Sequence, residues 1–275
     1  MSIEQIDTIE ERILEDYAEI DDVNIGYERY GHGPNYILGI CGGCGSYKKD
    51  FPEQVLRAFD PNYFTIVAMD PPGYGKSRPP ARNQEINRCK KDAKYGIGLM
   101  KHLNLVPFCV LGWSEGARTS IHVAHQGKDV VNRVIVMAVT TRVDPRIDQA
   151  FLGTRNTDHW LPETLEPYTR HYPEDFVRVE WAAVCDVVHK VYENTAGRFP
   201  SDLVLHTLKQ PMLNIYGGKD RFIMDQKYMQ EKVPTIRTAV HAQGGHDFYV
   251  KYSRWLAMKV TQFFKETSQE LKASL

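Results

Sequence analysis

The apolar residues of this chain gather in short runs that are separated by longer, more polar stretches. The runs that have the length of a buried β-strand lie at residues 36–40, 64–69, 108–111, 134–139, 210–216 and 236–240. Helix-compatible segments lie between these runs, and no repeat or low-complexity tract interrupts the series. This alternation predicts an α/β fold, with a mainly parallel sheet covered by helices on both faces.

The alternation stops between residues 140 and 200. A helix-like segment runs there from Pro173 to Tyr192, and its apolar residues recur at helical spacing, as in Trp181, Val184 and Val188. We therefore predict a core domain of residues 1–140 and 201–275, with a helical cap of residues 141–200 inserted after the strand at 134–139. The aromatic residues of the cap are expected mainly to pack within it, although a cap over a site must also line a pocket.

One short motif carries the strongest chemical signal. Residues 112–116 read Gly-Trp-Ser-Glu-Gly, and they stand between the apolar run at 108–111 and a helix-compatible segment that begins at Ala117. A GxSxG sequence in this context forms a sharp turn that lifts the serine above the sheet, which makes Ser114 the candidate nucleophile. The alternative is a Gly-Ser loop that only turns the chain.

A serine hydroxyl needs a histidine base and a carboxylate that orients this base. Asp220 follows the run at 210–216 through Gly217 and Gly218, and His246 follows the run at 236–240 through a Gly-Gly turn. This is the chain order Ser, acid, His that the motif predicts. Asp225 is the alternative acid, and Asp144 is a third choice.

Ten histidines compete for the role of the base. His122 and His125 fall on the helix after the motif and point away from Ser114, and His241 lies in or at the end of a strand. The remaining candidates lack a glycine-rich turn after a strand: His32, His102, His159, His171, His189 and His206. The position after such a turn selects His246.

Acyl transfer also needs N–H groups that stabilise the oxyanion, normally one after the nucleophile and one after an earlier strand. Glu115 supplies the first. The run at 36–40 ends in a glycine-rich loop, from which we assign the second N–H to Gly43, with Cys44 as the neighbour that could replace it.

These motifs together resemble the α/β-hydrolases over roughly residues 15–270. The resemblance rests on the turn at residues 112–116, the turn at 70–77 (Asp-Pro-Pro-Gly-Tyr-Gly-Lys-Ser), and the segments 216–220 and 244–248. It implies a mainly parallel eight-stranded sheet, with helices on both faces and a helical cap. Within this superfamily the chain is most similar to the biphenyl hydrolase-like proteins, the valacyclovir hydrolases.

That family cleaves esters of α-amino acids. The resemblance implies that the acidic residue directly after the nucleophile binds the ammonium group of the substrate, and in this chain that residue is Glu115. The family has aspartate at this position, followed by two glycines, whereas this chain has glutamate followed by Gly116 and Ala117. The extra methylene of glutamate shifts the carboxylate.

Composition narrows the class further. The chain has 275 residues, of which 42% are hydrophobic and 25% charged, and a formal net charge of −1, which gives no electrostatic reason to expect a nucleic acid or an anionic membrane surface as partner. No apolar run reaches membrane-spanning length, and residues 1–11 are acidic without a signal core. An odd number of cysteines, five, favours a reducing cytoplasm.

Three other features are weaker signals. Cys41 and Cys44 have CxxC spacing, but no second pair completes a zinc site and the glycines between them do not suit a redox motif. Gly75-Lys76-Ser77 lacks the first glycine of a phosphate-binding loop. The acidic run at residues 10–16 is interpreted as a solvated face or a frayed end.

The sequence therefore predicts a cytoplasmic serine hydrolase that acts on a small-molecule ester, without a metal or organic cofactor. The catalytic residues would be Ser114, His246 and Asp220, and the N–H groups of Gly43 and Glu115 would bind the oxyanion. The predicted substrates are α-amino acid esters. The alternatives are a carboxylesterase or thioesterase without amino-group selectivity, and a non-catalytic scaffold with the same fold.

Overall fold

The computed structural model describes residues 12–224 and 226–273, with side chains up to Ser268. Within these residues, eight strands form one sheet in the order β1-β2-β4-β3-β5-β6-β7-β8. The strands are β1 (Leu14–Ile20), β2 (Val23–Tyr30), β3 (Asn35–Ile40), β4 (Phe64–Met69), β5 (Phe108–Trp113), β6 (Val131–Met137), β7 (Met212–Gly217) and β8 (Arg237–His241). Strand β2 pairs antiparallel with both β1 and β4, and the other neighbours pair in parallel.

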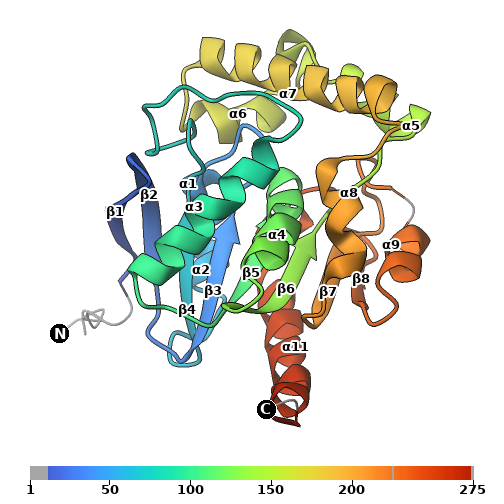
Figure 1. The fold of residues 1–275 in the computed structure, drawn as a ribbon. Coiled ribbons are helices and arrows are strands. Elements are labelled where there is room, and N and C mark those ends of the chain that lie inside the picture. The colour runs from blue at the N-terminus through green and yellow to red at the C-terminus, as the bar shows by residue number, and fades with distance from the viewer. Residues whose placement is uncertain (1–11, 225, 274–275) are drawn as a thin grey trace, which may run out of the picture.

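Helices cover both faces of this sheet (Figure 1). On one face, α3 and α4 lie side by side and α8 packs against α4, while α11 lies on the opposite face. The helices are α1 (Tyr47–Asp50), α2 (Glu53–Leu56), α3 (Arg88–His102), α4 (Glu115–Gln126), α5 (Pro145–Leu152), α6 (Pro162–Thr169), α7 (Glu174–Asn194), α8 (Pro200–Val204), α9 (Gln226–Lys232), α10 (Phe248–Lys251) and α11 (Ser253–Ala273).

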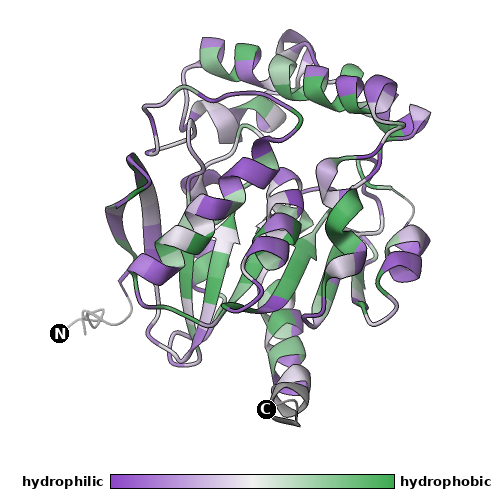
Figure 2. Ribbon diagram, viewed as in Figure 1, coloured by the Kyte–Doolittle hydropathy of each residue, from purple (hydrophilic) through white to green (hydrophobic). Residues whose placement is uncertain are grey.

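The central strands separate two apolar cores. Alternate residues of a strand point to opposite faces, so Leu38 and Val110 contribute to one core while Ile37 and Leu111 contribute to the other. All six residues of β4 and of β5 are buried. Burial on both faces explains why these strands read as continuous apolar runs in the sequence. Figure 2 shows the apolar strands in the interior and polar residues along the outer side of α3.

The predicted α/β-hydrolase fold with its mainly parallel eight-stranded sheet is confirmed. The pattern did not predict β1 and β2. Leu14–Asp16 belong to β1, so they are not a frayed end, but all three are exposed, in agreement with the alternative of a solvated face. Glu15 is paired with Lys48 and Lys76, which lower the pKa of its carboxyl to about 2. Glu10 and Glu11 lie outside the described residues.

Helices α5, α6 and α7 lie between β6 and β7 in the sequence and above the carboxyl ends of the parallel strands in space (Figure 1). They fall within residues 141–200, the segment that the sequence predicts as a cap. Tyr172, between α6 and α7, ties this cap to the core, because its hydroxyl donates to the carbonyl of Gly45 at 2.6 Å and accepts from the N–H of Gly75 at 2.7 Å. None of the described helices is both long and apolar enough to span a bilayer.

Candidate active site

Ser114 occupies a strained turn between β5 and α4. Its backbone has φ 55° and ψ −114°, in the region of positive φ that residues other than glycine rarely adopt. The turn requires glycine on both sides, since a Cβ at Gly112 would lie 2.2 Å from the carbonyl oxygen of Gly116, and a Cβ at Gly116 would lie 2.2 Å from that of Ile40. The GxSxG spacing therefore follows from how closely the turn packs against β3.

The structure brings Ser114, His246 and Asp220 together from three strand ends. His246 Nε2 lies 3.0 Å from Ser114 Oγ, and His246 Nδ1 lies 2.8 Å from Asp220 Oδ2. The Asp220 side chain is fully buried, and its other oxygen accepts from the N–H of Phe222 at 2.8 Å. These distances are those of a serine, a base and an orienting carboxylate joined by hydrogen bonds.

Two aromatic side chains hold His246 in this position. The indole N–H of Trp113 donates to the carbonyl of His246 at 2.8 Å, and the two ring centroids are 5.2 Å apart. The ring of Phe222 packs on the imidazole with centroids 5.3 Å apart. The motif residue Trp113 therefore fixes the loop that carries the base.

In the loop after β3, the N–H groups on either side of Gly43 are both hydrogen-bonded, and Gly43 lines the same cavity as Ser114. The N–H of Gly42 donates to Asp50 Oδ2 at 2.8 Å, and the N–H of Cys44 donates to the Tyr74 hydroxyl at 2.9 Å. No acceptor for the N–H of Gly43 is found among the described residues. The N–H of Glu115, in the first turn of α4, has no acceptor within its helix. This pattern favours Gly43 over Cys44 as the partner of Glu115 in an oxyanion hole.

The Glu115 carboxylate is enclosed by three arginines. One oxygen accepts from Arg88, whose Nε lies 2.9 Å away, and the other accepts from Arg82 Nη2 at 3.2 Å; Arg118 Nη2 lies 3.6 Å from the first oxygen. Burial acts to raise the pKa of Glu115, but Arg88, Arg82 and Arg118 together lower it to about 2. The role of this carboxylate as an ammonium ligand stays a prediction, and a substrate ammonium would have to compete with guanidinium groups for oxygens that are already hydrogen-bonded.

A small cavity of about 30 Å³ adjoins Ser114, roughly the volume of one water molecule. The cap closes it with side chains from α5, α6 and α7. The cavity is lined by Gly43, Trp113, Ser114, Glu115, Arg118, Phe151, Tyr168, Trp181, Val184 and His246. The cap aromatics therefore pack on one another and also line the site, since the Trp181 ring contacts that of Phe151.

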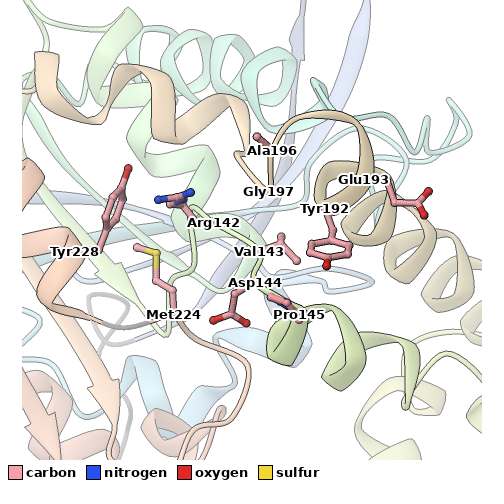
Figure 3. Close-up of a pocket in the computed structure, with 10 residues that line it drawn as sticks. All are labelled: Arg142, Val143, Asp144, Pro145, Tyr192, Glu193, Ala196, Gly197, Met224 and Tyr228. Carbon is pink, nitrogen blue, oxygen red and sulfur yellow. The ribbon is translucent and has the colours of Figure 1, made fainter.

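A larger groove, of about 790 Å³, is lined by a different set of residues, which Figure 3 shows. It is formed by the start of α5, the end of α7, and residues after β7, and it contains neither Ser114 nor His246. Asp144, the third choice for the acid, lines this groove and caps α5 by accepting from the N–H of Ile147 at 2.8 Å. Asp225, the other alternative, lies outside the described residues.

The two cysteines of the CxxC pair are not joined by a disulfide. Cys41 and Cys44 are both buried and free, and burial raises the pKa of both thiols. Among the described residues, no group of three or more His, Cys, Asp or Glu side chains could hold a metal ion.

The three arginines around Glu115 are the residues near the site that the sequence interpretation missed. Arg118 follows Ser114 by four residues, one helical turn, so the predicted helix placed it near the site. Arg82 and Arg88 come from the loop before α3 and from its start, and no local signal in the sequence brings them to Glu115.

Comparisons with known proteins agree with this fold. A family model described as "alpha/beta hydrolase fold" matches residues 36–165. The chain is 28% identical over 238 residues to "Serine hydrolase BPHL" of Mus musculus, covering 85% of this chain and 80% of that protein, and 27% identical over the same coverage to the Homo sapiens protein of that name. A crystal structure of a membrane phospholipase A superposes with a TM-score of 0.75 at 16% identity, covering 93% of this chain and 87% of that one, which shows the shared fold alone.

The chain thus has the α/β-hydrolase fold, with a serine, a histidine and an aspartate meeting at the carboxyl ends of the strands. Within that class it is similar to the biphenyl hydrolase-like serine hydrolases, and this similarity supports hydrolase activity.

Proposed function

We propose that this protein hydrolyses carboxylic esters through a covalent acyl-enzyme on Ser114. The observation that supports the proposal is the continuous chain of hydrogen bonds, 3.0 Å from Ser114 Oγ to His246 and 2.8 Å from His246 to Asp220. The names of the mouse and human relatives, both serine hydrolases, support the same class of chemistry.

In the first step, His246 takes the proton of Ser114 as its Oγ forms a bond to the acyl carbon. The carbonyl oxygen becomes an oxyanion, to which the N–H groups of Gly43 and Glu115 donate. The C–O bond to the alcohol then breaks, and His246 gives its proton to the departing oxygen. In the second step His246 takes a proton from a water molecule as the water oxygen forms a bond to the acyl carbon. The bond from this carbon to Ser114 Oγ then breaks, the acid is released, and His246 returns the proton to Oγ.

Asp220 stabilises the imidazolium and holds the neutral ring with its proton on Nδ1, which leaves Nε2 free to accept from Ser114. Burial of the Asp220 side chain keeps this hydrogen bond away from competing water.

We propose carboxylic esters as the substrate class rather than the narrower α-amino acid esters. The narrower expectation depends on Glu115 binding an ammonium, and the arginines that already occupy this carboxylate argue against it.

A fluorophosphonate probe tests the proposal, because it labels only an activated serine. We expect the wild-type protein to be labelled and to hydrolyse short esters, and Ser114→Ala to lose labelling and at least ~10⁴-fold in kcat. Ser253→Ala, which changes a serine on α11, is the matched control and should retain both. A folded Ser114→Ala protein that kept ordinary esterase activity would refute the assignment, and an unlabelled, inactive wild-type protein would favour a non-catalytic scaffold.

A further inference from the structure

Arg118 is a buried cation that lines the same cavity as the nucleophile. It lies one helical turn after Ser114 on α4, and its side chain is only 4% exposed. Burying a guanidinium is costly unless its N–H groups are paired, so the partners of Arg118 show whether it is there for structure alone.

The N–H groups of Arg118 are only partly hydrogen-bonded. Arg118 Nε is buried with no hydrogen-bond acceptor among the described residues, and the distance from Nη2 to Glu115 is 3.6 Å, longer than a hydrogen bond. The guanidinium stacks on the ring of Phe199, 4.0 Å from its centroid, and otherwise meets the neutral thiol of Cys89. These contacts position the guanidinium but leave N–H donors unused.

The neighbouring arginines are hydrogen-bonded to carboxylates, although Arg82 Nε, like Arg118 Nε, is buried without an acceptor among the described residues. Arg82 makes two hydrogen bonds to Asp92, of 2.9 and 2.7 Å, and Arg88 makes two to Glu115. Burial acts to lower the pKa of each arginine, but these carboxylates raise the pKa of Arg82 and Arg88 above the usual value. Burial lowers the pKa of Arg118, and the nearby Arg88 lowers it further, while Cys89 and Glu115 offset these effects only in part.

The ion pairs of this cluster therefore join three guanidiniums to two carboxylates within the described part of the chain, leaving one positive charge in excess. The next acid, Glu180, pairs with the neutral amide of Gln84 rather than with an arginine, and burial raises its pKa.

We infer that Arg118 binds a carboxylate on the substrate, so that the preferred substrates are short esters whose acyl part carries a second, free carboxyl group. This inference rests on the proposed ester hydrolysis and names its substrate class. A planar carboxylate can accept two parallel hydrogen bonds from the edge of a guanidinium. The stacking of Arg118 on Phe199 fixes the plane of this guanidinium. The acyl side is indicated because His246 must face the departing alcohol, whereas Arg118 packs with Gly43 against Glu115.

Two isosteric esters test the inference. Monoethyl succinate carries the free carboxylate, and ethyl succinamate has a neutral amide in its place; the acid released from each is followed by titration. We expect the wild-type protein to favour monoethyl succinate in kcat/KM by at least about 10-fold, which is the order of magnitude for one charge-assisted hydrogen bond. Ethyl 3-aminopropanoate, with an ammonium, should be the poorest of the three.

Arg118→Met should lower the ratio of kcat/KM for monoethyl succinate to that for ethyl succinamate by roughly 10- to 100-fold. The ratio for Arg118→Lys should lie between those of the wild type and Arg118→Met, because lysine keeps the charge but cannot make two parallel hydrogen bonds to a carboxylate. Arg170→Met is the matched control, since Arg170 on the cap is 66% exposed and pairs with Glu166. Its ratio should equal that of the wild type.

A second measurement needs no variant. Free succinate should protect Ser114 from the fluorophosphonate at lower concentration than succinamide does. Equal hydrolysis of the two esters by the wild type, equal protection by succinate and succinamide, or an unchanged ratio in Arg118→Met would each overturn the inference while leaving ester hydrolysis in place. Failure of the proposed function would differ, because no ester would be hydrolysed and no serine would be labelled.

Discussion

The two sides of Ser114 are built in opposite ways. On one side, which we call the catalytic side, Ser114, His246 and Asp220 form a single line of hydrogen bonds. His246 makes one bond to Ser114 and one to Asp220. On the other side, which we call the charged side, the single carboxylate of Glu115 is shared among the guanidinium groups of Arg82, Arg88 and Arg118.

This difference separates catalysis from selectivity. In the proposed function, the line of hydrogen bonds moves a proton and does not contact the rest of the substrate, as expected of a triad that serves many acyl groups. The crowded cluster leaves a charge unmatched beside the cavity, and an unmatched buried charge discriminates strongly between ligands. Breaking each side in turn should therefore change different properties of the protein.

The largest effect should come from the catalytic side. Asp220→Asn keeps the size of the side chain and an oxygen that can accept from the N–H of Phe222, so we expect the fold to be retained. The amide would favour the wrong tautomer of His246, and kcat should fall roughly 10⁴-fold. Steady-state kinetics on one short ester measure this loss.

Asp144→Asn is the matched control for this change, because Asp144 lines the larger groove and its capping hydrogen bond can be made by asparagine. Asp225→Asn tests the alternative that the sequence left open. A small effect at Asp220 together with a large one at Asp225 would show that the wrong acid was chosen.

The catalytic side could be predicted from the sequence, and the charged side could not. Ser114, Asp220 and His246 each follow an apolar strand through a glycine-containing turn, and parallel strands bring such turns to one edge of the sheet, so local patterns were enough to suggest their meeting. The strand pattern failed for β1, where Leu14 and Tyr17 are more than half exposed, because an edge strand need not be continuously apolar.

No local sequence pattern of this kind precedes the arginines of the charged side. Arg82 lies in a loop and Arg88 at the start of α3, and their approach to Glu115 depends on how α3 packs against α4. The family resemblance therefore suggested a free carboxylate at Glu115. Only the three-dimensional arrangement revealed that this carboxylate is already paired.

The second prediction breaks the charged side. Glu115→Gln would leave the buried guanidinium of Arg88 without a carboxylate, while Arg82 would keep Asp92 as its partner, and we expect the free energy of unfolding to fall by about 3–5 kcal/mol. Urea denaturation of the wild type and the variant measures this difference.

Glu166→Gln is the control for loss of one carboxylate, because its pair with Arg170 is exposed and should contribute at most about 1 kcal/mol. If Glu115→Gln were as stable as the wild type and lost only the hydrolysis of α-amino acid esters, Glu115 would be a substrate ligand. The contrast between the two sides would then be wrong.

The smallest expected effect concerns His122, a buried group on α4 one turn beyond Arg118. Neither of its ring nitrogens has a hydrogen-bond partner among the described residues, and burial lowers its pKa to about 4. Unlike Arg118, it is not among the residues that line the cavity beside Ser114. It therefore shows what an unpartnered titratable group on this helix does when it is only structural.

The direction of the pH effect follows from which state binds the proton. Between pH 6.5 and pH 4 the imidazole of His122 is protonated in the unfolded chain but neutral in the folded one, so the free energy of unfolding should fall as the pH is lowered. The loss relative to neutral pH should reach about 3 kcal/mol by pH 4. Glu28 and Asp70, whose pKa values burial raises to about 7, act in the opposite sense.

A comparison with His122→Leu isolates the effect, because both proteins contain Glu28 and Asp70. Urea denaturation at pH 7 and at pH 4 should show that the variant gains about 3 kcal/mol on the wild type as the pH falls. The succinate-to-succinamate ratio should be the same in both proteins, since His122 does not line the cavity. A difference in stability that did not change with pH would show that His122 is not held neutral by burial. A changed succinate-to-succinamate ratio in His122→Leu would show that loss of any unpartnered group on α4 alters selectivity, so that the effect of Arg118 would not be specific.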